Sequence, residues 1–200
     1  MSEPAKQEIA LVFNAPNMAT AVRLVLAGVI AWLLLQGGAT EILIAGILLI
    51  VAGITDGIDG FLARRLGQST LGGSIFDLVT DQLLIMPALI LSIKAGLFAR
   101  TDSLMPFNPY PYAVISLIAG VTVLVGVVTF IWKNRTRRVE FPPPTKTAKL
   151  IFCLWIPTLA IAILGIGPDI LLAAFMYMSI IATIVGFTTY LKKANYVFTD

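Results

Sequence analysis

Long apolar segments are the feature that most constrains what this chain can fold into. Stretches long enough to cross a hydrocarbon core of about 30 Å, which takes roughly 20 helical residues, recur between residues 18 and 193. A chain inside lipid must satisfy its backbone hydrogen bonds internally, so each stretch is expected to be a helix. We therefore predict an all-α, polytopic membrane protein with six transmembrane helices, at 18–37, 41–66, 70–97, 111–133, 146–166 and 168–192.

The composition agrees with one membrane domain and leaves no room for a separate soluble one. Hydrophobic residues make up 58% of the chain and charged residues 12%, with a mean hydropathy of +0.92. We expect an interfacial segment at 1–17, a transmembrane domain at 18–193 and a tail at 194–200. Cys153 lies in a hydrophobic run and is expected to be buried. Histidine is absent from the sequence, so acid-base and metal chemistry must come from carboxylates.

The distribution of Lys and Arg predicts the orientation, because cytoplasmic loops retain positive charge. With the N-terminus inside, the inner side collects twelve of the fourteen basic residues and the outer side only Lys94 and Arg100. Both termini and the connection between the second and third helices are therefore expected to be cytoplasmic. The net charge of +3 follows from this pattern and gives no reason to expect a nucleic-acid partner.

Four aspartates lie where the second predicted helix ends and the third begins. The segment TDGIDGFLARR carries Asp56 and Asp59, and LGGSIFDLVTDQ carries Asp77 and Asp81. Each pair has a spacing of three or four residues, which places both carboxylates on one face of a helix. The short connection predicts that the two helices pack as antiparallel neighbours, so that all four carboxylates can converge.

Carboxylates in the membrane cost at least about 2.5 kcal/mol each on insertion scales, so they need a compensating partner. Hard oxygen ligands suit Mg²⁺ or Mn²⁺, and we predict a site for two such ions at the cytoplasmic ends of the second and third helices. The alternative is that the aspartates are helix caps or ion-pair partners of Arg23, Arg64 and Arg65. That alternative explains one aspartate more easily than four in one place.

The residues around the aspartates complete a longer pattern, D-x2-D-G-x2-A-R-x8-G-x3-D-x3-D. With all its intervals intact, the pattern resembles the signature of the CDP-alcohol phosphotransferase family, whose members also have six spans. The matching positions here are Asp56, Asp59, Gly60, Ala63, Arg64, Gly73, Asp77 and Asp81. The glycines could instead have a structural role in close helix packing, which small residues often mediate in membranes.

This resemblance implies a role in phospholipid biosynthesis. A CDP-linked lipid, usually CDP-diacylglycerol, would be the donor, and CMP would leave as an alcohol hydroxyl attacks the lipid-side phosphorus. The resemblance further implies a homodimer in the inner membrane of a prokaryotic cell, with the active site cytoplasmic. Asp56, Asp59 and Asp77 would bind metal, and Asp81 would bind the second ion and act as the base. The CDP-lipid would contact Gly60, Ala63, Arg64, Gly73, Asn17 and Thr20.

Two further segments concern the acceptor alcohol. NAPNMATAVR, with Pro16, Asn17, Thr20 and Arg23, and TKTA at 145–148 resemble elements of members that use glycerol 3-phosphate. Such members usually carry Lys directly after the last aspartate, whereas Gln82 stands here. We expect the acceptor phosphate to contact Lys146, Arg23 and Arg135, although these basic residues could equally reflect orientation or contact anionic lipid. Inositol phosphate or another alcohol stays open as the acceptor.

Buried carboxylates also mark ion pathways, so a cation transporter is the rival class. A transporter predicts acidic residues spread through the membrane depth, whereas these lie at one end of two helices. A non-catalytic scaffold or degenerate paralogue predicts the loss of at least one aspartate of the pattern, and all four are present.

Overall fold

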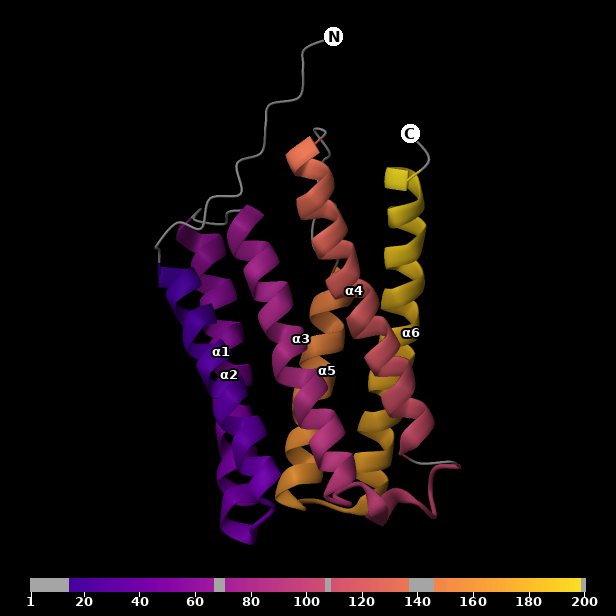
Figure 1. The fold of residues 1–200 in the computed structure, drawn as a ribbon. Helices are drawn as coiled ribbons and strands as arrows, with labels where there is room; N and C mark the ends of the chain where they lie inside the picture. The colour runs from indigo at the N-terminus through magenta and orange to yellow at the C-terminus, as the bar shows by residue number, and fades with distance from the viewer. Residues whose placement is uncertain (1–14, 67–70, 107–108, 137–145, 199–200) are drawn as a thin grey trace.

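Six long helices make up the described part of the chain in a computed structural model (Figure 1). They are α1 (Ala15–Gln36), α2 (Ala39–Leu66), α3 (Leu71–Lys94), α4 (Tyr110–Thr136), α5 (Lys146–Leu164) and α6 (Asp169–Phe198), with a short 3₁₀ helix, η1 (Ala99–Thr101), between α3 and α4. The structure describes the backbone at 15–66, 71–106, 109–136 and 146–198, and side chains at 18–57, 73–106, 109–128, 131 and 150–189. The prediction of an all-helical protein is confirmed over these residues, which contain no strand.

Glycines end several helices. Gly37 follows α1 with φ 71° and Gly165 follows α5 with φ 64°, in the left-handed region that only glycine adopts without strain. The predicted first and fifth helices, 18–37 and 146–166, thus end within one or two residues of the observed ends at Gln36 and Leu164. The last helix runs to Phe198, beyond the predicted end at 192. The predicted interfacial segment lies largely outside the described residues.

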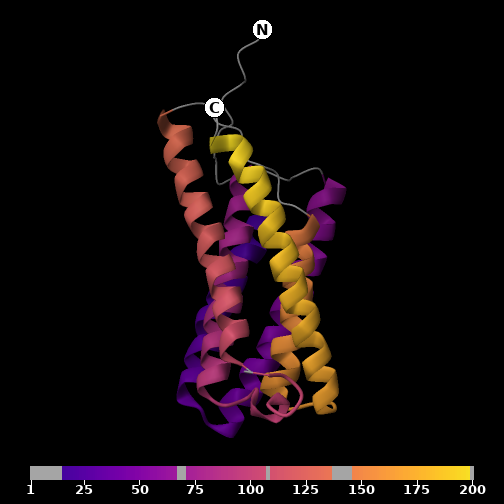
Figure 2. The same ribbon diagram turned by 90° about the vertical axis from the view of Figure 1, so that its right-hand side faces the viewer.

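The helices form one bundle in which α1 and α5 each pack against both α2 and α3. The remaining pairs are α3 with α4, α4 with α6 and α5 with α6. Among the described residues no Cα of α2 lies within 8 Å of a Cα of α3, so the predicted direct packing of these two helices is not found there, although their aspartate side chains do converge. Helix α1 contacts both of them instead. Figures 1 and 2 show the start of α1 and the end of α6 at one end of the bundle and the η1 loop at the other.

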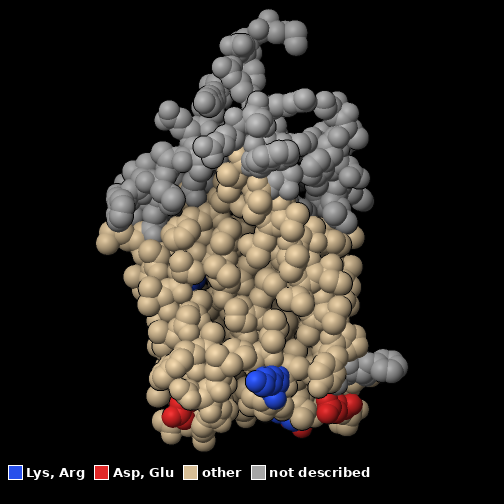
Figure 3. All heavy atoms as spheres, viewed as in Figure 1, with Lys and Arg blue, Asp and Glu red and all other residues tan. Residues whose placement is uncertain are grey.

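The outer surface is as apolar as the interior. Core residues such as Leu49, Leu84 and Trp155 are almost fully buried, yet many large hydrophobic side chains are exposed along the helices. Figure 3 shows a broad uncharged surface, with most of the visible charged side chains near the end that carries the η1 loop. Five helices are long and apolar enough to cross a membrane, over Met18–Gln36, Ala39–Gly57, Gly73–Lys94, Tyr110–Val128 and Asp169–Thr189.

The protein is thus an integral membrane protein, and its apolar exterior corrects one prediction. Cys153 on α5 is exposed rather than buried. A hydrophobic run predicts burial only where the surroundings are water, because lipid covers apolar side chains equally well. The apolar part of α5 described here, Leu150–Leu164, is shorter than the other five spans, so a sixth span stays a prediction.

Buried polar contacts join α5 to α6. The Trp155 indole Nε1 donates to Thr183 Oγ1 at 3.0 Å, and the hydroxyls of Thr158 and Ser179 lie 2.9 Å apart. At the end opposite the termini, Arg100 Nη2 donates to the Ile166 carbonyl at 2.9 Å. Hydrogen bonds between helices in lipid typically stabilise a bundle by about 0.6 kcal/mol and at most about 2. These contacts hold the α5–α6 pair in a fixed register beside α2.

Candidate metal centre

Three of the four predicted aspartates come together inside the bundle. Asp56 is on α2, and Asp77 and Asp81 are one turn apart on α3. One carboxylate oxygen from each lies within 4.8 Å of the others. Their side chains are 26%, 36% and 18% exposed respectively, so they are partly enclosed yet open to a ligand.

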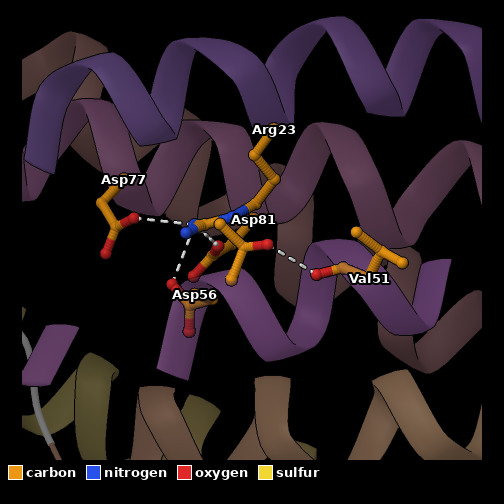
Figure 4. A network of polar contacts seen from close by, with 6 residues as sticks. Arg23, Val51, Asp56, Asp77 and Asp81 are labelled. Carbon is orange, nitrogen blue, oxygen red and sulfur yellow. Dashed lines mark hydrogen bonds and ion pairs between the residues drawn. The ribbon is translucent and has the colours of Figure 1, made fainter. Parts of the chain in front are cut away.

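Arg23 of α1 lies at the centre of this cluster (Figure 4). Its Nη1 is 2.9 Å from Asp56 Oδ1, 2.9 Å from Asp77 Oδ1 and 3.2 Å from Asp81 Oδ1. Only 1% of the Arg23 side chain is exposed. Because α1 packs against both α2 and α3, its arginine reaches carboxylates from two helices that do not themselves pack together in the described residues.

The arginine only partly satisfies the alternative in which the aspartates are ion-pair partners. One guanidinium carries one positive charge and three carboxylates carry three negative ones, so Arg23 by itself does not balance the charge of the three aspartates. Negative charge left in an apolar region is unfavourable. A further cation is therefore expected at these carboxylates.

The donor set fits a hard divalent cation. All three groups are carboxylates, which Mg²⁺ and Mn²⁺ prefer, and they come from positions that fixed helices hold close together. One helix turn beyond Asp56, Asp59 continues the same face of α2, and its side chain lies outside the described residues. Asp56, Asp77 and Asp81 are thus the described side chains that would hold a metal.

The other predicted site residues divide into two groups. Thr20, one turn before Arg23 on α1, is buried with 5% exposure, and Gly73 lies one turn before Asp77 on α3. These two positions therefore lie on the helix segments that carry the cluster. The remaining predicted side chains lie outside the described residues, namely Asn17, Asp59, Gly60, Ala63, Arg64, Arg135 and Lys146.

A groove of about 400 Å³ runs between α2 and α5 from the aspartate cluster. Asp56 and Gly57 lie at one end of it and Ile166 lies at the other, and the remaining lining side chains are apolar. They are Ile50, Gly53 and Ile54 of α2 with Phe152, Cys153, Ile156, Pro157, Ala160 and Ile161 of α5. Sequence analysis missed this groove. A signal was present in Gly46 and Gly53, seven residues apart on one face of α2.

Those two glycines bring α2 and α5 close together. A Cβ at Gly46 would lie 2.4 Å from Leu164 Cδ2, and a Cβ at Gly53 would lie 2.6 Å from Ile156 Cγ2. A side chain at either position would therefore force its neighbour on α5 to move. The absent side chain at Gly53 also leaves space in the groove that begins at Asp56.

Comparison with known proteins agrees with this site. The family model described as CDP-alcohol phosphatidyltransferase matches residues 13–186, which include every described member of the cluster.

Among curated relatives, enzymes named CDP-diacylglycerol–glycerol-3-phosphate 3-phosphatidyltransferase are similar over part of the chain. The one from Salmonella choleraesuis (strain SC-B67) is 35% identical over 79 residues, 40% of this chain and 43% of the relative. That from Pseudomonas fluorescens is 36% identical over 81 residues, 40% of this chain and 42% of the relative. That from Escherichia coli (strain K12) is 35% identical over 79 residues, with the same coverage as the first. The alignments thus span less than half the length of these relatives. Because the family model covers most of the sequence, the chain belongs to the CDP-alcohol phosphatidyltransferase family.

Proposed function

We propose that this protein is a phospholipid-synthesising enzyme of the phosphatidylglycerophosphate synthase type. It would transfer the phosphatidyl group of CDP-diacylglycerol to a hydroxyl of glycerol 3-phosphate and release CMP. The observation that carries the proposal is the convergence of Asp56, Asp77 and Asp81 within 4.8 Å at one end of an apolar groove. A substrate with a charged diphosphate and an apolar tail needs both features side by side.

The reaction forms one bond and breaks another at the lipid-side phosphorus. The acceptor oxygen attacks this phosphorus, the bond from phosphorus to the CMP oxygen breaks, and the hydroxyl proton must leave. Asp81 would take that proton as the general base. Two divalent ions, Mg²⁺ or Mn²⁺, held by Asp56, Asp59, Asp77 and Asp81, would offset the negative charge that develops on the phosphates.

The donor site would extend in two directions from Asp56. The groove between α2 and α5 is apolar and opens onto the outer surface that lipid would cover. It therefore suits an acyl chain. On the other side, Gly60, Ala63, Arg64 and Gly73 would contact the CDP group together with Asn17 and Thr20. Glycine and alanine permit close approach of a flat base or sugar, and arginine can bind phosphate through two hydrogen bonds.

The acceptor is proposed from the sequence and from the relatives. The segment with Pro16, Asn17, Thr20 and Arg23 and the names of the similar enzymes both support glycerol 3-phosphate, with Lys146, Arg23 and Arg135 contacting its phosphate. Gln82, which stands where members that use glycerol 3-phosphate usually carry Lys, lies between α3 and α4. A Cβ at Gly120 of α4 would lie 2.7 Å from Gln82 Oε1, so this side chain packs against α4.

The membrane arrangement of the enzyme is part of the proposal. We propose six spans, a prokaryotic inner membrane, and both termini and the aspartate site on the cytoplasmic side, where a water-soluble acceptor is available. The positive-inside distribution of Lys and Arg supports this orientation. A homodimer is carried over from the family resemblance alone.

CMP release from CDP-diacylglycerol tests the proposal directly. The full chain in detergent would be incubated with the donor, Mg²⁺ and one of glycerol 3-phosphate, inositol phosphate or serine, with excess EDTA as the metal-free arm. We expect CMP only with glycerol 3-phosphate and none in EDTA. Release with inositol phosphate or serine would keep the family reaction and replace the acceptor. Failure with every acceptor would contradict the proposed function and favour a non-catalytic paralogue or a cation transporter.

A further inference from the structure

Arg23 raises a question that the proposed reaction does not answer, because it contacts one oxygen of each of the three carboxylates that would hold a metal. A single atom, Nη1, lies within 2.9 to 3.2 Å of Oδ1 of Asp56, Asp77 and Asp81. Figure 4 shows the guanidinium group reaching between Asp77 and Asp56. Arginine and metal are therefore two candidates for one position.

The two occupants exclude each other on steric grounds. Mg²⁺ binds oxygen ligands at about 2.0 to 2.1 Å, so an ion shared by these three oxygens would lie among them. Nη1 already lies among them at hydrogen-bonding distance. An ion at that position would overlap the guanidinium nitrogen, and one of the two must leave the three Oδ1 atoms.

Charge favours the same exchange. The four aspartates of the pattern carry the charge that two divalent ions neutralise, so Arg23 would then add an excess positive charge directly beside the ions. Like charges a few ångströms apart repel strongly in a region of low dielectric. Without the ions, Arg23 supplies a positive charge to three partly buried carboxylates. Its removal would leave them to repel one another more strongly.

We propose that Arg23 is an exchangeable counter-cation of the aspartate site. It holds Asp56, Asp77 and Asp81 together before metal binds, and it is displaced from their Oδ1 atoms when a divalent ion enters. Arg23 thereby lowers the metal affinity of the site and keeps the metal-free bundle stable. A displaced guanidinium is then available to the acceptor phosphate, the role predicted for Arg23 from the sequence. The inference rests on the metal binding of the proposed function.

The test measures metal binding and stability rather than turnover. Wild type, R23Q, R23K and D77N would be purified as full chains in detergent, and free Mn²⁺ would be followed by electron paramagnetic resonance during titration. We expect R23Q to bind Mn²⁺ about tenfold more tightly than wild type, because no cation has to be displaced. R23K keeps the charge and should stay within about threefold of wild type. Both figures are order-of-magnitude expectations for losing or keeping one close charge.

Thermal unfolding provides the second readout. In EDTA, R23Q should melt at a lower temperature than wild type, since removal of one partner from a buried charge cluster is destabilising. Saturating Mn²⁺ should then raise its melting temperature by more than it raises that of wild type. Should R23Q not survive without metal, it would be purified in Mn²⁺, and after dialysis it should retain more Mn²⁺ than wild type treated in the same way.

Several outcomes would overturn the inference. Equal or weaker Mn²⁺ binding by R23Q, or lower retention after dialysis, would show that Arg23 does not compete with metal. An equal increase in Mn²⁺ affinity in R23Q and R23K would mean that side-chain volume, and not charge, causes the effect. D77N separates this inference from the proposed function. If D77N abolishes Mn²⁺ binding and R23Q leaves the Mn²⁺ affinity unchanged, the site binds metal as proposed and only the exchange with Arg23 is overturned. No Mn²⁺ binding by wild type overturns both.

Discussion

Asp81 has the most enclosed side chain of the three described carboxylates, with 18% exposed against 26% for Asp56 and 36% for Asp77. Asp77 and Asp81 differ little in position along α3, since one turn separates them. Their difference in enclosure nevertheless suits different tasks. A proton acceptor benefits from exclusion of water, whereas a group that only holds an ion does not need it.

Substitution of Asp81 tests this division at the level of one residue. We expect D81N to reduce CMP release by at least about 100-fold, because a positioned general base contributes typically 10² to 10⁴-fold. The matched control is D102N, since Asp102 is an exposed aspartate in the connection at the other end of the bundle and should leave CMP release near the wild-type rate. Activity of D81N within a few-fold of wild type would assign the base elsewhere.

The four aspartates could be predicted from the sequence because charge inside an apolar run is costly and therefore requires a function. The position of Arg23 could not. The sequence offered Arg23 only as one of three possible ion-pair partners, since a basic residue near the inner end of α1 is also expected from orientation alone, and it did not indicate that one nitrogen reaches carboxylates on two helices. Only the packing of α1 against α2 and α3 places Nη1 on three carboxylates.

At the scale of elements, contact between α2 and α5 depends on glycine. Ala substituted for Gly53 would place its Cβ 2.6 Å from Ile156 Cγ2, a methyl group on a stiff β-branched side chain. Ile156 or the helix that carries it must then move, at a cost of about 1 to 3 kcal/mol. This exceeds the roughly 0.5 to 1 kcal/mol that Gly to Ala gains inside a helix. We therefore expect G53A to lower the thermal unfolding temperature.

The control for G53A is the same substitution at Gly28 in the middle of α1, where an added Cβ would meet nothing within 4 Å. G28A gains the helix preference without the clash and should unfold at or above the wild-type temperature. Both variants would be followed by circular dichroism in the same detergent. Equal unfolding temperatures for G53A and G28A would show that α2 and α5 are not held at this distance.

The α5–α6 pair depends on a different interaction. T183V removes the acceptor of the Trp155 indole, whose side chain is 1% exposed, while it keeps the side-chain volume. We expect a loss of about 0.6 to 2 kcal/mol in unfolding free energy, measured by denaturation in sodium dodecyl sulfate. T188V is matched to it, because the exposed Thr188 hydroxyl donates within its own helix to the Val185 carbonyl at 3.0 Å. A loss for T188V as large as that for T183V would contradict a specific role of the interhelical bond.

Helix positions were predictable because each of the six apolar runs, separated by glycine and proline, is expected to form a helix in a membrane. Which helices pack against each other was less predictable. A short connection fixes that α2 and α3 run in opposite directions, but it does not fix which faces touch, and α1 contacts both. Exposure of Cys153 also escaped prediction, because an apolar sequence does not distinguish a lipid-facing side from a protein-facing side.

For the whole molecule, the two ends differ in charge, and this difference gives the last prediction. The described end opposite the termini carries Glu41, Asp102 and Asp169 beside Lys94 and Arg100, while the other twelve basic residues belong to the inner side of the predicted topology. Since the bundle places the start of α1 and the end of α6 at the same end (Figures 1 and 2), one labelling experiment can fix the orientation. In a C153A background, D102C should react with a membrane-impermeant maleimide in intact bacterial cells. A cysteine added after Asp200 should react only once the cells are permeabilised, because the positive-inside distribution keeps that end in the cytoplasm. The reverse pattern would place the aspartate site outside, away from the cytosolic supply of a phosphorylated acceptor, and would contradict the proposed reaction as well as the topology.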